Sequence, residues 1–220
     1  NYVATTAYHA AKRDQAQNLT VPAPHARRWS PDAPWLYRCR VSLLDAKGEL
    51  IDVQDVLFGF RSLEMVSELN PREGHQPGAL LLDGVPVFLR GANIQGLNAL
   101  WFWGEHEKLL HVLFLLKAAN FNSIRACQHV LFPEVRELLD RLGLMSQQDV
   151  GCRYPRTGEQ TRAELVHAAG VIAKVCFNNP GVVLLTFANE TEFEPTEMLK
   201  GAMATDPERI FVPISGRRVG

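Results

Sequence analysis

Residues 178–190 have the sequence NNPGVVLLTFANE, and they decide how the rest of the chain is interpreted. The Asn-Asn-Pro-Gly turn ends one element, and the six residues after it are apolar except for Thr186. A short apolar run between turn signals is typical of a strand that is buried on both faces, as in a parallel sheet. We therefore predict a buried parallel strand over residues 182–189.

Asn189 and Glu190 end this run. An amide and a carboxylate at the C-terminal end of a buried parallel strand stand where barrel enzymes carry their catalytic groups. The alternative is that the pair caps the next helix, because Asn and Glu suit a first turn. Taken alone, the pair fits the cap better, and the rest of the chain favours a catalytic site.

The composition is that of a globular protein with room for one large core or two smaller ones. The chain has 220 residues, of which 46% are apolar and 21% charged, and its net charge is −1. This near-neutral balance predicts no binding to nucleic acid or to an anionic membrane surface. No apolar run reaches transmembrane length, and the first residues do not form a signal peptide. The chain does not begin with Met, so we expect a processed or truncated N-terminus.

The four cysteines are scattered without the spacing of metal ligands, and they are Cys39, Cys127, Cys152 and Cys176. We interpret them as reduced core thiols rather than as disulfides, which favours a cytoplasmic location.

The first part of the chain has the pattern of antiparallel sheet. Two prolines in residues 29–37, WSPDAPWLY, fix an extended turn that leads into a strand. Residues 36–44 alternate roughly between apolar and polar, residues 45–48 (DAKG) form a hairpin turn, and residues 49–60 return as the partner strand. Residues 1–66 are thus expected to belong to a β-sandwich.

After a polar linker or exposed loop over residues 67–78, strands and helices alternate. The predicted strands cover residues 80–82, 85–89, 121–127, 144–148, 182–189 and 210–214. The predicted helices cover residues 105–120, 133–142 and 160–177, with a further one that ends at residues 206–207. This alternation predicts a parallel sheet with right-handed crossovers over residues 79–220. A doubly wound sheet is complete with five such units, whereas an eight-stranded barrel is not.

Several motifs, in chain order, resemble the family 2 glycoside hydrolases, the group of β-galactosidases, β-glucuronidases and β-mannosidases. They are WSPDAPWLY (29–37), FGFR (58–61), DGVPVFLRGAN (83–93), ANFNSIR (119–125), DRLGL (140–144), NP (179–180) with NE (189–190), and DPER (206–209). The resemblance implies an internal fragment: the C-terminal part of an immunoglobulin-like β-sandwich, then the first five βα units of a TIM (β/α)8 barrel. In that barrel residues 83–93 hold the first strand.

The resemblance also implies an activity, that of a retaining exo-β-glycosidase acting on terminal β-linked sugars. Such enzymes use two carboxyl groups, one on each side of the bond that is cleaved. Glu190 matches the general acid/base, and Asn189 matches the amide that holds the 2-hydroxyl of the sugar. The nucleophilic Glu of the family lies near the end of the seventh strand, beyond this chain, so we expect the chain by itself to be inactive.

Other matched residues are expected to bind the substrate. Arg125 would hold the nucleophile in its ionised form, although a surface ion pair is the alternative. His129, Asn93 and Asp149 lie near strand ends and are expected to contact the sugar. Trp101 and Trp103, in the first βα loop, would stack on sugar rings or close the mouth of the barrel.

The sequence departs from the galactosidase pattern in two places. Asn93 is followed by Ile-Gln-Gly instead of His-Glu, and residues 149–152 (DVGC) lack the magnesium ligands of some members. We therefore expect neither a metal nor another cofactor. The expected partners are a carbohydrate substrate and either the remainder of the enzyme or further copies of the chain. The alternative function is a truncated or degenerate module that binds carbohydrate or a partner without catalysis.

Overall fold

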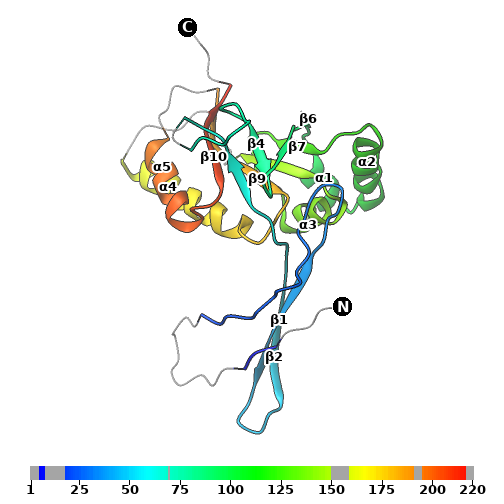
Figure 1. The fold of residues 1–220 in the computed structure, drawn as a ribbon. Helices are drawn as coiled ribbons and strands as arrows, with labels where there is room; N and C mark the ends of the chain where they lie inside the picture. Colours follow the sequence, from blue (N-terminus) through cyan, green and yellow to red (C-terminus); the bar gives the residue numbers. More distant parts are fainter. Residues whose placement is uncertain (1–4, 8–17, 69, 150–158, 191–194, 217–220) are drawn as a thin grey trace.

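The computed structural model describes residues 5–7, 18–68, 70–149, 159–190 and 195–216, and of residues 159–162 the backbone only. Its strands form three sheets (Figure 1). The first two are antiparallel: β1 (Tyr37–Leu44) with β2 (Leu50–Phe58), and β3 (Leu63–Met65) with β4 (Leu80–Leu82) and β5 (Val85–Val87). The third is a parallel sheet of five strands: β6 (Gly91–Asn93), β7 (Ser123–Ala126), β8 (Met145–Asp149), β9 (Val182–Asn189) and β10 (Ile210–Ser215). The helices are α1 (Leu97–Phe102), α2 (His106–Ala118), α3 (Pro133–Leu142), α4 (Glu159–Cys176) and α5 (Thr196–Thr205).

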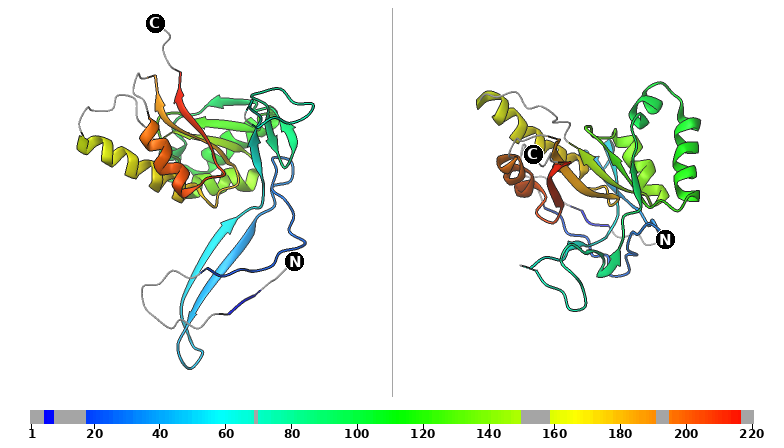
Figure 2. Two further views of the ribbon diagram at one scale, coloured as in Figure 1. Left: turned by 60° about the vertical axis from the view of Figure 1, so that its left-hand side comes forward. Right: turned by 90° about the horizontal axis from the view of Figure 1, so that it is seen from above.

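The parallel strands follow one another across the sheet in chain order, from β6 to β10. A doubly wound sheet reverses its strand order at a switch point, whereas a barrel adds each strand beside the preceding one. The doubly wound alternative is therefore wrong for this sheet. Figure 2 shows a curved sheet accompanied by the helices, an arrangement consistent with part of a TIM barrel.

The two faces of the parallel sheet pack against different parts of the chain. Residues of α1, α2 and α3 pack against Ile124 and Ala126 of β7, and residues of α4 and α5 pack against Phe187 of β9. On the other face, Met145 and Val183 pack against Trp29, together with Leu63 and Val87 of the small antiparallel sheet. The helices thus cover one face, and the segment before the parallel sheet covers part of the other.

Helix α3 begins and ends where its sequence predicts. Pro133 stands in its first turn, where the missing N–H costs nothing, and Glu134 lies beside it. Gly143 ends the helix with a left-handed φ of 66°, which glycine adopts without strain. The strand prediction over residues 182–189 is also confirmed, because β9 has these bounds.

One prediction at the start of the parallel sheet is wrong, and one element was not predicted. Residues 83–93 do not form one barrel strand, because β5 pairs with β4 and only Gly91–Asn93 pairs with β7. Between them, the side chain of Asn122 accepts from the backbone N–H of Arg90 at 2.8 Å and donates to the carbonyl of Phe88 at 2.9 Å, taking bonds that a strand partner would make. The short helix α1 was not predicted.

Residues 67–78 connect β3 to β4, and these two strands pair with each other. The segment is therefore a loop between adjacent strands of one sheet. The proposed division into residues 1–66 and 79–220 stays a prediction.

The hairpin of β1 and β2 extends away from the rest of the molecule (Figures 1 and 2). Within the described residues it is a two-stranded sheet and not a full sandwich. Its apolar side chains are largely exposed: Val41, Leu43, Leu50, Ile51 and Val53. Cys39 also lies here and is exposed, so its interpretation as a core thiol is wrong in this structure, whereas Cys176 is buried as expected. Cys127 is partly buried, and Cys152 lies outside the described residues.

The segment after the hairpin contacts the start of β9. A side chain at Gly59 would bring its Cβ to within 2.8 Å of the Pro180 ring, so only glycine fits this approach without a shift. Arg61 then donates to the carbonyl of Pro180 at 2.9 Å and to that of Val182 at 3.0 Å. The motif at residues 58–61 and the Asn-Pro-Gly turn are thus parts of one contact.

A buried polar cluster surrounds the same turn. Asp140 accepts from the side-chain amide of Asn179 at 2.6 Å and from the backbone N–H of Gly181 at 2.8 Å. The indole N–H of Trp29 donates to the backbone carbonyl of Asp140 at 2.8 Å. Arg209, paired with Asp206 at 2.9 Å, also donates to the carbonyl of Val182. The amino end of β9 is therefore held by charged and amide groups from several elements.

Among the helices of the described part, none combines the length and apolar character that crossing a membrane requires.

Candidate active site

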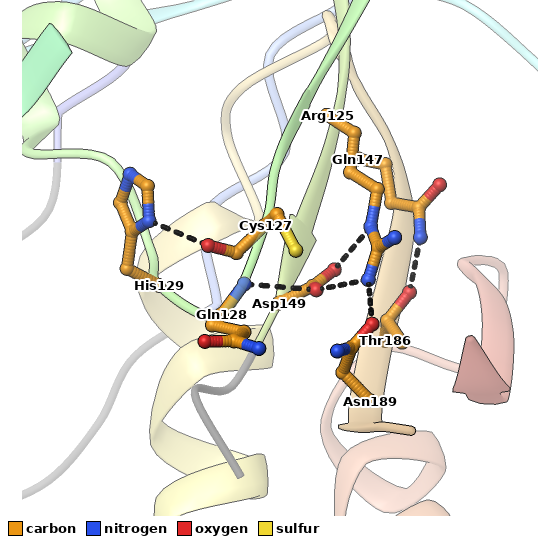
Figure 3. A network of polar contacts seen from close by, with 8 residues as sticks. All are labelled: Arg125, Cys127, Gln128, His129, Gln147, Asp149, Thr186 and Asn189. Carbon is orange, nitrogen blue, oxygen red and sulfur yellow. Dashed lines mark hydrogen bonds and ion pairs between the residues drawn. The ribbon is translucent and has the colours of Figure 1, made fainter. Parts of the chain in front are cut away.

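Three polar side chains meet at the carboxyl ends of β7, β8 and β9 (Figure 3). Arg125 lies one residue before the end of β7, Asp149 ends β8 and Asn189 ends β9. The carboxyl ends of parallel strands meet at one edge of a sheet, which is where barrel enzymes place their catalytic groups. Residues that are far apart in the chain are therefore brought together by strand order alone.

Arg125 is the centre of this group. Its Nη2 donates to Asp149 Oδ2 at 2.6 Å and to Asn189 Oδ1 at 2.7 Å, and its Nε donates to Asp149 Oδ1 at 3.3 Å. The Asp149 side chain is only 3% exposed and that of Arg125 is 17% exposed. The arginine thus makes a two-point ion pair with the carboxylate, a contact with a defined geometry.

The charge of Arg125 is well supported by its neighbours. Partial burial lowers the pKa of Arg125, but the hydrogen bond and the charge of Asp149 raise it by more, and the charges of Cys127 and Glu190 act in the same direction. The net pKa of Arg125 is raised, so the guanidinium stays charged and is paired with the Asp149 carboxylate. The contribution of Glu190 also shows that its carboxylate lies within electrostatic reach of the guanidinium.

Glu190 follows β9 directly with a backbone φ of 49°. This left-handed conformation is uncommon for residues other than glycine, and such residues are concentrated at functional sites. Its backbone N–H donates to the carbonyl of Ser215 in β10 at 2.9 Å, and its side chain is exposed. The next described helix, α5, begins at Thr196 with Pro195 at its N-cap position. The alternative that Asn189 and Glu190 cap that helix is therefore wrong.

His129 lies on the loop between β7 and α3, close to this group. Its Nδ1 is 2.9 Å from the carbonyl oxygen of Cys127. A carbonyl oxygen only accepts, so this contact places a ring hydrogen on Nδ1. The carbonyl of His129 accepts in turn from the backbone N–H of Asp149 at 3.3 Å.

The remaining predicted residues lie on the β6 side of the sheet. Asn93 ends β6 in register with Arg125 and is exposed. Trp101, in α1, packs against the buried core and stacks on His106 with a ring separation of 4.2 Å, so it has a structural contact. Trp103, just after α1, is 72% exposed and has the free surface that a stacking partner needs.

The structure also shows polar residues that the sequence did not single out as part of a site. Gln147 donates to the hydroxyl of Thr186 at 2.7 Å, and it lies next to Arg125 in the sheet register. Gln128 has a left-handed φ of 65°, and its N–H donates to Asp149 Oδ2 at 3.0 Å. Thr186 is the polar residue within the apolar run of β9, whereas Gln147 lies in the largely polar strand β8 (MSQQD), and these polar positions were the available signal. In the described part of the chain, no cluster of three or more His, Cys, Asp or Glu side chains is arranged to hold a metal ion.

Comparison with known proteins supports a family assignment. Residues 2–61 match the family model described as Glycosyl hydrolases family 2. A β-galactosidase of Aeromonas hydrophila is 30% identical over 212 residues, covering 87% of this chain and 18% of the relative. A β-galactosidase of Psychromonas ingrahamii is 33% identical over 137 residues, covering 60% of this chain and 12% of the relative. The chain therefore spans less than a fifth of the length of these curated relatives.

Solved structures show the same fold at lower identity. The family 2 β-galacturonidase of Eisenbergiella tayi, bound to galacturonate, has a TM-score of 0.71 and 22% identity, covering 87% of this chain and 34% of that one. A Parabacteroides merdae β-glucuronidase has a TM-score of 0.70 and 18% identity, covering 89% of this chain and 26% of that one. The family model, the curated relatives and the order of the sequence motifs agree, and the chain belongs to family 2 of the glycosyl hydrolases.

Proposed function

We propose that the chain supplies the acid/base side of a retaining exo-β-glycosidase that hydrolyses terminal β-linked sugars. The observation that carries this proposal is the 2.7 Å hydrogen bond between Arg125 and Asn189, with Glu190 next in the chain. This bond joins a cation of β7 to the amide at the end of β9, across β8, and the Glu190 carboxylate follows that amide in the chain. The relatives named as β-galactosidases and the structural neighbours named as β-glucuronidases support a β-glycoside as the substrate.

In the proposed reaction Glu190 acts twice. As a general acid it protonates the oxygen of the leaving group while a second carboxylate attacks the anomeric carbon and forms a glycosyl-enzyme. As a general base it then takes a proton from the water that hydrolyses this intermediate. We assign the second carboxylate to a part of the protein that this chain does not span.

The neighbouring residues bind the sugar and prepare the charges. Asn189 holds the 2-hydroxyl of the sugar, and the positive charge of Arg125 keeps the nucleophile ionised. His129 and Asn93 contribute further polar contacts, Asp149 pairs with Arg125, and Trp103 offers an aromatic face. Trp101 is kept as a weaker candidate because its ring already stacks on His106.

The finer architecture is part of the same proposal. We propose that residues 1–66 belong to an immunoglobulin-like sandwich, that residues 67–78 are the loop between β3 and β4, and that residues 79–220 form the first five units of an eightfold barrel. The exposed apolar side chains of the β1–β2 hairpin support a second sheet over it, and the strand order supports the barrel.

The first test is a panel of nitrophenyl β-glycosides incubated with the protein in the full length that its gene encodes. We expect turnover of one sugar class, and the panel names it. If the folded protein hydrolyses none of these glycosides, the proposed enzymatic activity is contradicted and a non-catalytic module is favoured.

The second test uses Glu190→Gln in the same full-length protein. The amide keeps the shape but cannot donate or take the proton, so the rate with poor leaving groups should fall by roughly 10²–10⁴. Activated aryl groups leave without being protonated, so the glycosyl-enzyme should still form from these substrates. It should then accumulate, because the second step lacks its base. Azide needs no base, so it should restore turnover and release a β-glycosyl azide.

Glu197→Gln is the matched control, because Glu197 is an exposed carboxylate in the first turn of α5, paired with Lys200. It should keep the wild-type rate and show no response to azide. Equal losses for good and poor leaving groups in Glu190→Gln, with no azide rescue, would remove Glu190 from the acid/base role.

A further inference from the structure

Asp149 has the contacts of a residue that holds its neighbours. Its Oδ2 accepts from Arg125 Nη2 at 2.6 Å and from the backbone N–H of Gln128 at 3.0 Å, and its Oδ1 accepts from Arg125 Nε at 3.3 Å. The Asp149 side chain is only 3% exposed, so its carboxylate oxygens accept hydrogen bonds from protein groups rather than from solvent. It ties the end of β8 to β7 and to the loop that follows β7.

Arg125 transmits this constraint to Asn189. A guanidinium only donates hydrogen bonds, so the group of Asn189 that faces Nη2 at 2.7 Å must be the carbonyl oxygen. The NH2 of the same amide is then turned away from the arginine. The orientation of this amide therefore depends on the position of the guanidinium, and the guanidinium is held at two points by Asp149.

We infer that Asp149 is a positioning residue that fixes Arg125 and, through it, the orientation in which Asn189 offers its amide N–H groups to the substrate. The inference rests on the proposed function, because it requires Asn189 to contact a sugar hydroxyl. It gives Asp149 a role different from the direct sugar contact expected from the sequence. Through these contacts Asp149 would affect the binding of the one substrate hydroxyl that Asn189 contacts, and not the binding of the other hydroxyls.

The test combines protein variants with substrates that lack one hydroxyl each, in the full-length protein. Asn189→Ala first identifies the hydroxyl that the amide contacts. For that hydroxyl, the deoxy substrate and the parent should have the same kcat/KM in the variant, because the contact is already lost. Asp149→Asn should then lower kcat/KM for the parent glycoside by about tenfold to a hundredfold, as expected for a lost bond to a charged group. For the substrate that lacks the identified hydroxyl, the same variant should lower kcat/KM by no more than about threefold.

Asp206→Asn is the matched control. Asp206 is also a buried aspartate paired with an arginine, Arg209, at 2.9 Å, but it lies beside the amino end of β9. Any loss that it causes should be equal for the parent and the deoxy substrates. Arg125→Lys is the second variant, because an amine keeps the positive charge but cannot span Asp149 and Asn189 in the way the fork does. It should lower kcat/KM more for the parent glycoside than for the deoxy substrate even where Asp149→Asn fails to fold.

The outcomes separate the two proposals. Selective loss with the parent substrate supports the positioning role. Equal losses of Asp149→Asn and Arg125→Lys on both substrates overturn it while the enzyme itself stands. Absence of wild-type turnover on every glycoside overturns the proposed function and the positioning role with it.

Discussion

At the scale of single residues, Asp140 is a carboxyl group whose charge is costly. Burial raises the pKa of Asp140 to about 7, although the hydrogen bonds from Asn179 and Gly181 and the charges of Arg136 and Arg209 lower it. The folded protein therefore holds a proton on Asp140 at a pH where the unfolded chain has released it, because a free Asp has a pKa of about 3.9.

This difference predicts stability that falls as the pH rises. Between the unfolded and folded pKa values the folded state binds more protons, so the contribution of Asp140 is fully present below about pH 4 and is lost as the pH rises from there through about 7. From pH 6 to pH 8 the free energy of unfolding should fall by about 1 kcal/mol. Denaturant unfolding of the wild-type protein and of Asp140→Asn at both pH values measures this. A slope that is the same in the variant would assign the pH dependence to other groups.

The sequence predicted which residues gather at the site better than it predicted how they bond. The resemblance and the predicted strand ends together pointed to Arg125, Asp149 and Asn189, and these residues lie close together because strand ends of a parallel sheet share an edge. It could not give the hydrogen bond between Gln147 and Thr186, since that depends on the register between β8 and β9, which shifts by a residue near Ser146. The stacking of Trp101 on His106 was also not predicted, because it depends on the helix α1, which the sequence pattern did not indicate.

At the scale of elements, the contact between Gly59 and Pro180 joins the hairpin segment to β9. The Cβ of any other residue at position 59 would lie 2.8 Å from Pro180 Cγ and 3.1 Å from Trp29 Cβ. Proline is a rigid ring, so the contact cannot be relieved by a change of rotamer. The backbone of one segment would have to move away from the other.

Gly59→Ala should therefore destabilise the protein by about 1–3 kcal/mol, the usual cost of overpacking. Gly170→Ala is the matched control, since in the middle of α4 the new Cβ would meet its nearest atom at 3.6 Å, an ordinary contact. That change should be neutral or stabilise by up to about 1 kcal/mol through helix propensity. Thermal unfolding of the two variants compares them directly, and equal shifts would show that the Gly59 contact is easily relieved.

Strand boundaries show where sequence patterns lose precision. Residues 182–189 were predicted with the observed bounds, because a turn and a polar pair mark both ends. Residues 83–93 were not divided correctly, because the side chain of Asn122, far away in the chain, takes the backbone bonds of Phe88 and Arg90. A distant polar side chain that replaces a strand partner leaves no mark in the local pattern.

At the scale of the whole molecule, the β1–β2 hairpin exposes apolar side chains that the proposed sandwich would cover. Tyr37, Cys39, Val41 and Leu43 alternate along β1 and share one face, whereas Arg38 and Arg40 lie on the other. Arg40 pairs with Asp55 across the hairpin at 2.8 Å on that second face, which β2 also supplies with Val53 and Leu57. The proposed sandwich would bury the first face, where the side chains of β1 are apolar.

Cys39 reports on this burial. In the full-length native protein its thiol should resist a thiol reagent until denaturant is added, like that of Cys176, which is buried in this structure. A cysteine introduced by Arg38→Cys, one residue away on the opposite face, should react at once. Rapid labelling of Cys39 in native protein, located by peptide mass spectrometry, would contradict the sandwich over this hairpin.

The anchoring of β9 has a consequence for how such a protein can change through evolution. Its position along the strand axis is set at the amino end, where Arg61 and Arg209 both donate to the carbonyl of Val182. Asn189 lies seven residues further along the same strand, roughly 23 Å away at an ordinary strand rise. The contacts that fix the strand and the proposed site residues lie at opposite ends of β9. Residues around Asn189 can therefore change during evolution to suit a new sugar while the contacts at Val182 are kept. Substitution of Arg61 or Arg209, in contrast, would displace all the groups at the carboxyl end of β9 together. We therefore expect related proteins with different substrates to differ most at the carboxyl ends of these strands.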